Sequence, residues 1–338
     1  MPPNEQHSAA VVSPPEACTA VPARLSPEPL DPQITSIQPG GGLCMRLELA
    51  WGYVRRWYLK NFRRGYVGRM GALRRGAKNV CPFEPLDPRD VKFYRNLGGY
   101  YWELPDDPFG WRDRLPFVRV GLTELWLISG GFFAAAVVLI RVFPPLACVP
   151  AILGLCIVWF FRDPRRRVPQ GEGLVVAPAD GKVVEIRELE HDEYIGGPAV
   201  QIGIFLSVFN VHVNRTPVAA RVIGLSYRRG RFLNAMRPES SRENEQLAVR
   251  IEQSSPPYRR MIVRQIAGLI ARRIVCWVKP GDELAAGEKF GMIKLGSRTE
   301  LVFPREPGMR IPVQLGEMVK AGESVLVSYN QTAGVSSV

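Results

Sequence analysis

Cysteine and histidine are scarce in this chain of 338 residues, and their spacing excludes the sites that they usually build. No two of the six cysteines have the C-x-x-C spacing of a zinc or redox site, which favours a reducing cytoplasm as the setting. The three histidines, His7, His191 and His212, lie far apart in the sequence, so we expect no metal. A glycine-rich nucleotide fingerprint between a strand and a helix is also missing, so a bound nucleotide coenzyme is not expected.

The charge of the chain suits two kinds of partner. A formal charge of +12 and an isoelectric point near 9.7 are typical of proteins that bind nucleic acid and of proteins that meet an anionic membrane surface. No recognised nucleic-acid module accompanies the basic residues, so we expect no nucleic-acid partner. With 46% hydrophobic and 22% charged residues, the composition predicts one good-sized globular core with appended segments.

The first 111 residues divide into two segments of different composition. Residues 1–42 are rich in Pro, Ser, Ala and Gly without apolar periodicity, which predicts a disordered tail. This tail lacks the basic start and apolar run of a secretory signal. Residues 43–111 interleave aromatic residues with many arginines and lysines. Such a segment either lies on anionic headgroups, with its rings at the interface, or forms a solvated basic helix or arm packed on the domain.

Two long apolar runs follow, at residues 122–140 and 142–161, and each is about long enough to cross a hydrocarbon core. The Pro144-Pro145 pair favours a sharp turn between them, so residues 112–167 are predicted to form a membrane helical hairpin with basic flanks. Arginines on both flanks predict that both ends lie in the cytoplasm. The alternative is a pair of helices buried in a soluble core.

From residue 168 to residue 338 the chain consists of short runs rich in Val and Ile, broken by Gly and Pro. This pattern predicts a mainly β (α+β) catalytic domain of sandwich or barrel type. Two stretches echo each other, VKPGDELAAGEKFGMIKLG and VQLGEMVKAGESVLVSY, each with a strand, a glycine turn and a second strand. They resemble the hairpins of lipoyl and biotinyl carrier domains.

Five separated stretches carry a more specific signal, between about residue 161 and the C-terminus. They are FFRDPRRRVP, VVAPADGKV, FLSVFNVHVNRTPV, RENEQ and the longer stretch that contains MIKLGSRTELVFP. In this order they resemble the phosphatidylserine decarboxylase family, whose members are self-cleaving proenzymes. Arg298, directly after the serine of Leu295-Gly296-Ser297, is similar to the shorter Gly-Ser-Arg branch of that family.

The resemblance implies that the chain breaks itself between Gly296 and Ser297. The Ser297 hydroxyl attacks the Gly296 carbonyl, which glycine leaves sterically open. β-Elimination then cuts the ester, and hydrolysis leaves a pyruvoyl group at position 297 of the shorter, α fragment. This covalent group is the implied cofactor, because it forms a Schiff base with the substrate amine and takes up the electrons released with carbon dioxide. From the tripeptide alone, an ordinary Gly-Ser turn is the other interpretation.

His212 and Asp180 complete the candidate site. His212 is the only histidine in one of the resembling stretches, which implies that it is the base that activates Ser297. Asp180 is the candidate for orienting that histidine, by the general logic of a triad. Each has a simpler interpretation: His212 as an imidazole satisfied within a strand, and Asp180 as a turn-capping residue before a glycine. Whether His212 serves both self-cleavage and decarboxylation stays open.

The resemblance also implies the substrate and the setting. Phosphatidylserine would be converted to phosphatidylethanolamine and CO2 at the cytoplasmic side of the cell (inner) membrane, with anionic lipid and the β and α fragments of the same chain as partners. The sequence leaves open whether two copies form a homodimer. The alternatives are a pyruvoyl decarboxylase of a related serine lipid or a soluble amino acid, and a non-catalytic membrane-tethered carrier-like module with an uncut chain.

Overall fold

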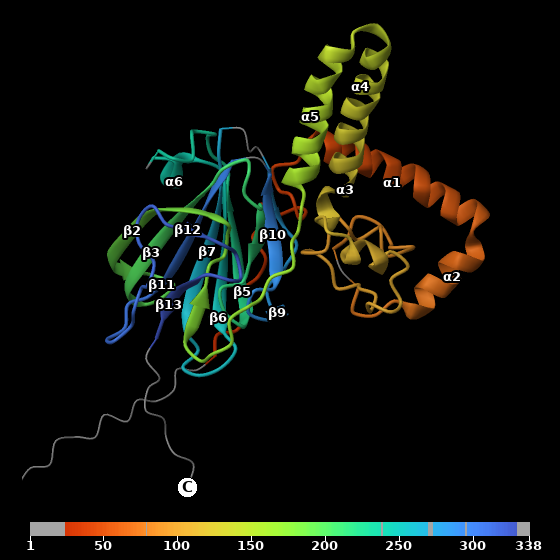
Figure 1. Ribbon diagram of the computed structural model, residues 1–338. Helices are drawn as coiled ribbons and strands as arrows, with labels where there is room; N and C mark the ends of the chain where they lie inside the picture. Colours follow the sequence, from red (N-terminus) through yellow and green to blue (C-terminus); the bar gives the residue numbers. More distant parts are fainter. Residues whose placement is uncertain (1–23, 79, 238, 270–272, 295, 330–338) are drawn as a thin grey trace, which may run out of the picture.

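The computed structural model describes residues 24–78, 80–237, 239–269, 273–294 and 296–329 (Figure 1). A β-sandwich forms the main body, and an apolar helical hairpin and a smaller helical unit stand beside it (Figure 1). The mainly β fold with a preceding apolar hairpin, which the sequence predicts, is confirmed.

All strand pairs of the sandwich are antiparallel. The described strands are β1 (Leu174–Val176), β2 (Gly181–Asp192), β3 (Gly197–Leu206), β4 (Val213–Arg215), β5 (Ala220–Arg228), β6 (Gln246–Gln253), β7 (Arg260–Ala267), β8 (Arg273–Cys276), β9 (Glu283–Leu284), β10 (Lys289–Lys294), β11 (Ser297–Pro304), β12 (Met318–Val319) and β13 (Val325–Ser328). The large sheet has the order β12-β2-β3-β11-β7-β6-β5-β9, a three-stranded sheet has the order β4-β10-β8, and β1 pairs with β13.

Strand β11 lies inside the large sheet, hydrogen-bonded to β3 on one edge and to β7 on the other. Its residues alternate between two buried environments, because successive side chains of a strand point to opposite faces. Leu301 and Phe303 pack in the main core between the sheets, whereas Val302 packs in a smaller cluster on the other face. A strand buried on both faces and paired on both edges is a rigid support for its first residue, Ser297.

The two stretches that echo each other in the sequence adopt the same turns. Gly281 and Gly316 have φ of 94° and 90°, and Gly287 and Gly322 have φ of 71° and 73°. The short strands β9 and β12 that lie between these glycines form the two outer edges of the large sheet. A Cβ atom built on Gly287 would lie 3.6 Å from the Cα of Gly322, so the second turns of the two stretches meet. The structure therefore brings the second glycine turns of the two stretches together.

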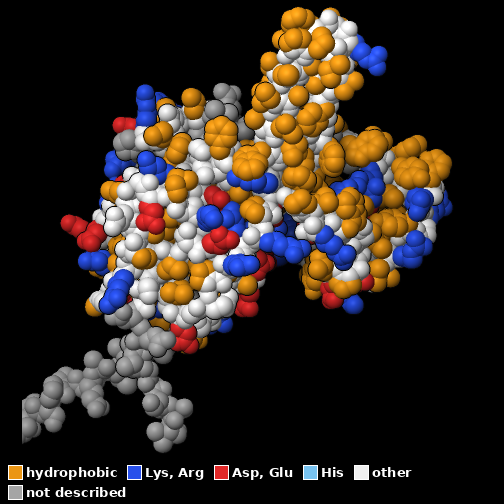
Figure 2. All heavy atoms as spheres, in the orientation of Figure 1, with side chains coloured by type: hydrophobic (Ala, Val, Ile, Leu, Met, Phe, Trp, Pro, Cys, Tyr) orange, Lys and Arg blue, Asp and Glu red, His pale blue; other side chains and the backbone are white. Residues whose placement is uncertain are grey.

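The helices precede the sandwich in the chain, apart from one short helix within it. They are α1 (Leu43–Phe62), α2 (Arg64–Leu73), the 3-10 turns η1 (Gly110–Arg114) and η2 (Arg119–Gly121), α3 (Leu122–Glu124), the π-helical η3 (Leu125–Ser129), α4 (Gly130–Val142), α5 (Pro144–Phe160) and α6 (Ser240–Glu243). Helices α4 and α5 form the hairpin, which projects from the body as a column of hydrophobic side chains (Figures 1 and 2). Of the described helices, one stretch, Arg119–Val142, is long and apolar enough to cross a membrane.

The predicted disordered tail needs a correction. Residues 1–23 lie outside the described residues, but residues 24–42 run along the sandwich and are ordered against it. The Glu28 amide donates to the Ile223 carbonyl at 2.7 Å, and the Cys276 amide donates to the Ile37 carbonyl at 2.8 Å. Ile34 is buried in the main core. Two well-placed isoleucines and main-chain hydrogen bonds offset the ordering entropy in a segment whose composition is otherwise that of a tail.

The basic residues of the segment 43–111 are partly neutralised within the fold. Arg56 is buried and donates to Asp90 at 3.1 Å and to the Glu84 carbonyl at 2.7 Å, while Arg55 pairs with Asp87. Met45 and Leu59 of α1 are buried, but many of its other apolar residues are exposed along its length: Leu43, Leu47, Trp51, Val54, Tyr58 and Phe62. Their spacing of three and four residues puts them on one helical face, which leaves an apolar stripe facing outward.

Ile34→Ala tests the packing of the N-terminal segment. Removing a fully buried isoleucine side chain should lower the free energy of unfolding by about 2–5 kcal/mol, measured by denaturant titration of the detergent-solubilised protein. Leu43→Ala, at a position that is 70% exposed, is the control and should change it by less than about 0.5 kcal/mol. Equal, small effects at both positions would show that residues 24–42 do not pack on the sandwich.

Candidate active site

The site centres on Ser297, the first residue of β11. Ser297 is completely buried, opposite Leu206 of β3 and Ala267 of β7. Its hydroxyl oxygen has no hydrogen-bond partner among the described residues. A buried polar atom left without a partner costs about 1–3 kcal/mol, and most such atoms in native proteins are paired. This unpaired hydroxyl is therefore a feature that packing does not explain.

Gly296 presents its carbonyl to the serine in a conformation that suits glycine. Its φ is +61°, in the left-handed region that other residues enter only at a cost. The Gly296 carbonyl lies against Gly268, where a built Cβ would come within 2.3 Å of the carbonyl oxygen. Glycine is thus required at both positions, at the first by conformation and at the second by close approach. Leu295, the first residue of the predicted motif, lies outside the described residues.

His212 lies directly before β4 and reaches the same peptide. Its Nε2 accepts a hydrogen bond from the Gly296 N–H at 3.2 Å, and its Nδ1 lies 2.9 Å from the Asn210 carbonyl. These partners assign the proton to Nδ1 and a lone pair to Nε2, since a carbonyl only accepts and an amide N–H only donates. Burial lowers the pKa of His212 to about 4, so the imidazole is neutral at physiological pH.

The histidine ring is held on a second side by the hairpin. The Phe160 ring, at the end of α5, has its centroid 4.5 Å from that of His212. Two other residues at the same end hold the loop before the histidine: Trp159 Nε1 donates to the Phe209 carbonyl at 3.2 Å, and Arg162 donates to the same carbonyl at 2.8 Å. The foot of the apolar hairpin is therefore a wall of the site.

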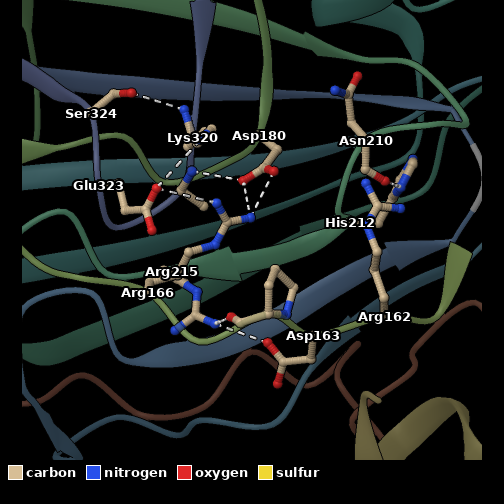
Figure 3. Close-up of polar contacts among 12 residues, drawn as sticks. Arg162, Asp163, Arg166, Asp180, Asn210, His212, Arg215, Lys320, Glu323 and Ser324 are labelled. Atoms are coloured by element: carbon tan, nitrogen blue, oxygen red, sulfur yellow. Dashed lines mark hydrogen bonds and ion pairs between the residues drawn. The ribbon is translucent and has the colours of Figure 1, made fainter. Parts of the chain in front are cut away.

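Asp180 lies in the turn between β1 and β2, but its carboxylate faces Arg166 rather than His212 (Figure 3). Arg166 Nη2 donates to its two oxygens at 2.9 and 2.7 Å, and the Ala321 amide donates to it at 2.8 Å. In this structure the Asn210 carbonyl, not Asp180, orients the His212 ring. The turn of Asp180 is nevertheless bonded to β4, because the Arg215 amide donates to the Pro178 carbonyl at 2.9 Å.

A network of charged side chains extends from Asp180 along the repeated turns (Figure 3). Arg215 donates to Asp163 at 2.9 Å and to the Gly287 carbonyl at 3.1 Å, and Lys289 pairs with the same aspartate at 2.6 Å. Arg166 also lies 3.7 Å from Glu323. Burial is the main cause that lowers the pKa of Arg215, and Asp163 opposes it. These arginines are committed to internal ion pairs.

A row of uncharged polar side chains lies beside Ser297, on the inner face of β11. Asn214 donates to the Thr299 hydroxyl at 3.0 Å and accepts from Gln265 at 2.9 Å, and all three residues are fully buried. The sequence reasoning did not single out these residues or Phe160. A signal existed for several of them, because Asn214 lies in FLSVFNVHVNRTPV, Thr299 in MIKLGSRTELVFP and Phe160 in FFRDPRRRVP. Asn210 lies in the same stretch as His212.

Charged residues occupy the opposite face of the same strand. Arg298 donates to Glu300 at 2.8 Å and to Glu185, and Arg264 lies 3.5 Å from Glu300. Burial raises the pKa of Glu300, and the two arginines oppose that shift. Across the described part of the chain, no cluster of three or more His, Cys, Asp or Glu side chains is placed to hold a metal ion.

The fold and the site together define a class: a mainly β protein in which a buried serine follows a glycine whose amide is bound by a neutral imidazole, at the foot of an apolar hairpin. A family model for phosphatidylserine decarboxylase matches residues 153–327. A phosphatidylserine decarboxylase proenzyme of Rhodopirellula baltica is 52% identical over 241 residues, which cover 71% of this chain and all of the relative. One of Syntrophus aciditrophicus is 44% identical over 227 residues, 67% of this chain and all of the relative. The chain belongs to the phosphatidylserine decarboxylase family and is a decarboxylase.

The burial of His212 predicts a pH dependence of stability. The unfolded histidine binds a proton below its ordinary pKa of 6.5, whereas the folded one does so only below about 4. As pH falls from about 6.5 to about 4, the folded protein should therefore lose about 3 kcal/mol of stability through this group.

The measurement is the free energy of unfolding as a function of pH. It is made on Ser297→Ala protein, which keeps the chain intact, with and without the further substitution His212→Gln. Only the difference between the two profiles reports on His212, because carboxylates titrate in the same range. Parallel profiles would contradict the prediction.

Proposed function

We propose that this chain is a proenzyme that cleaves itself between Gly296 and Ser297 and then converts phosphatidylserine to phosphatidylethanolamine and carbon dioxide. The observation that carries the proposal is the buried, unpartnered hydroxyl of Ser297. It directly follows a glycine carbonyl, and the amide of that glycine is bound by a neutral histidine. The names of the relatives, which are decarboxylase proenzymes, support it.

The self-cleavage requires a nucleophile, an open carbonyl and a base, and the site supplies all three. His212 Nε2 takes the hydroxyl proton as Ser297 Oγ attacks the Gly296 carbonyl carbon, and the amide nitrogen leaves protonated, which converts the amide into an ester. Loss of the Ser297 α-proton then expels the Gly296 carboxylate by β-elimination. The remaining dehydroalanine tautomerises to an imine, which takes up water and releases ammonia, so the fragment 297–338 begins with a ketone.

The residues around Ser297 fit a pyruvoyl group derived from it. The serine oxygen that has no partner is replaced in that group by a hydrogen, so no hydrogen bond of the described structure is lost at this atom. A pyruvoyl group held at this position would supply an electron sink for the decarboxylation of an amine substrate. His212, with its lone pair at Nε2 and a pKa of about 4, accepts a proton near this position at physiological pH.

Asp180 is proposed to act as a positioning residue for His212. Its carboxylate fixes the turn through Arg166 and Ala321, and that turn is bonded through Pro178 to β4, which begins one residue after the histidine. The effect of Asp180 on the imidazole would therefore pass through the backbone rather than through a direct hydrogen bond. This differs from the triad arrangement, in which the carboxylate contacts the ring.

A lipid substrate suits the surface around the site. Phe209, Met236 and Leu269 are exposed on three loops, with exposed fractions of 67%, 61% and 59%. The first of these loops is held by the foot of the hairpin, and the last contains Gly268, which lies against the Gly296 carbonyl. We propose that the hairpin inserts into the membrane and brings this apolar rim to the headgroup layer. The arginines on both hairpin flanks favour the cytoplasmic side of the cell membrane for the sandwich.

Ser297→Ala tests the chemistry. Alanine has no hydroxyl for the acyl shift, so the variant should remain one chain of about 37.8 kDa with no decarboxylase activity, whereas the wild type should appear as fragments 1–296 and 297–338 in a denaturing gel and by intact mass. Borohydride should trap the terminal ketone of the short fragment. Ser297→Cys, which keeps a nucleophile, should cleave slowly.

Two kinds of result would contradict the proposal. Full activity in an uncut wild-type chain, or a free serine amine on the fragment, would refute self-cleavage. Turnover of free serine but not of phosphatidylserine would refute the lipid substrate.

Protease protection tests the sidedness. With the hairpin inserted and both of its ends in the cytoplasm, protease added to sealed, right-side-out cells should leave the sandwich intact, and permeabilisation should expose it to digestion. The readout is an immunoblot for the sandwich, with a known periplasmic protein as the control for access. Digestion of the sandwich in sealed cells would place it on the opposite side.

A further inference from the structure

A cavity of about 350 Å³ lies in the N-terminal helical unit. It is enclosed by α1, by the segment around residues 83–93, by η1 and by the start of the long apolar helix. None of the residues that line it belongs to the site of Ser297, and neither the family match nor the proposed reaction uses it.

The cavity carries more positive than negative charge. Its two acidic side chains are already paired, Glu48 with Lys92 and Asp90 with Arg56. Arg89 and Arg112 also line it, and neither forms an ion pair with a carboxylate among the described residues. The Nε atom of Arg89 is buried without a hydrogen-bond partner.

The arginines of the cavity crowd around one aromatic ring. The guanidinium carbons of Arg89, Arg112 and Arg55 lie 4.5, 5.1 and 5.5 Å from the centroid of Phe109. Asp87 pairs with Arg55, so Arg89 and Arg112 remain beside each other with no carboxylate in ion-pair contact among the described residues. Asp87 and Asp107 act on them only from a greater distance. Burial lowers the pKa of Arg89, and the charges of Arg112 and Arg55 lower it further. An anion placed between these groups would remove the mutual repulsion.

The rim of the cavity is apolar and continuous with the surfaces that suit a membrane. Leu47 and Trp51, on the exposed stripe of α1, and Leu127, on the stretch Arg119–Val142, are 54%, 62% and 60% exposed. Helix α1 runs outward from the foot of the hairpin (Figure 1), and hydrophobic side chains cover both in the space-filling view (Figure 2). A ligand here would meet cations at its head and apolar side chains along its body.

We propose that this cavity is a second lipid site, which binds the phosphate group of an anionic phospholipid on Arg89 and Arg112 and leaves the acyl chains along Leu47, Trp51 and Leu127. A free phosphate would use the cations but not the apolar rim, and a zwitterionic lipid would bring a cation of its own, which opposes the charge of its phosphate. The site is separate from Ser297, so binding here does not depend on self-cleavage or on decarboxylation.

The test uses full-length Ser297→Ala protein in a neutral detergent, with dioleoyl phosphatidylglycerol as the probe and native mass spectrometry as the readout. Phosphatidylglycerol has no amine to react, so the catalytic site does not contribute chemistry. One phosphatidylglycerol should be retained in preference to phosphatidylcholine of the same chains. The double substitution Arg89→Gln and Arg112→Gln should weaken it by about tenfold or more, because each juxtamembrane cation contributes on the order of 1 kcal/mol.

Two matched controls separate the cavity from general charge and from misfolding. Arg114→Gln removes one exposed charge from the same turn, η1, and should leave binding within about twofold, since a surface charge outside the cavity contributes little. Gly52→Leu fills the cavity from α1, where a new Cβ meets no atom within 4 Å, and should weaken binding without removing a charge. Because leucine favours a helix more than glycine does, this loss would not reflect unfolding of α1. Gly68→Leu on α2, which is equally open, should have no effect.

Three outcomes would overturn the proposal. Arg114→Gln could weaken binding as much as either Arg89→Gln or Arg112→Gln, which would show diffuse surface attraction. Inorganic phosphate could displace the lipid at an equal concentration, which would assign the cavity to free phosphate. Gly52→Leu could bind as the unsubstituted protein does, which would place the lipid elsewhere.

Discussion

The hydrogen bond from the Gly296 amide to His212 Nε2 joins the three parts of the molecule on which the site depends. Gly296 precedes the central strand of the large sheet, and His212 precedes β4 of the small sheet. Phe160 brings the hairpin against the same imidazole. Strand β11 is paired on both edges, so the Gly296–Ser297 peptide cannot shift without breaking two sets of main-chain hydrogen bonds. The sheet therefore fixes the position of this peptide, and His212 reaches it from the loop before β4.

The ion pairs around β11 lie away from Ser297, although the charge of Arg162 acts on His212. The inner face of β11 next to Ser297 holds only neutral polar groups, Thr299, Asn214 and Gln265, whereas the ion pairs lie on its outer face and on the repeated turns. Burial disfavours a cationic imidazole, which keeps His212 unprotonated at physiological pH. The same burial leaves the Ser297 hydroxyl without a partner, at a cost that a well-packed core of two sheets is able to tolerate.

The hairpin serves more than one purpose in this arrangement. Its outer length is exposed and apolar, while its last turn is a wall of the site and holds the loop before His212. Anything that moves the hairpin relative to the sandwich would therefore also move the imidazole. Lys294, two residues before Gly296, pairs with Glu124 in α3, so the long apolar helix also contacts the chain just before the Gly296–Ser297 peptide. The apolar hairpin and the candidate site therefore share two residues, Trp159 and Phe160.

Local patterns were sufficient to predict the broad architecture and part of the site. Runs of Val and Ile with glycine turns predicted a β domain, two long apolar runs predicted the hairpin, and the motif at Gly296-Ser297 and His212 could be chosen from its resemblance to a family. These signals are local, because alternation and apolar length follow from the backbone geometry of each segment alone.

The contacts of the site residues, by contrast, join positions that are far apart in the sequence. Gly296 is 84 positions from His212, and Ala321 is 141 positions from Asp180. The packing of the sheets therefore decided that Asn210 rather than Asp180 orients the imidazole, that Phe160 covers it, and that Ile34 completes the core. Each of these three contacts depends on which surfaces remain exposed after the sheets have formed. Local sequence patterns do not predict those surfaces.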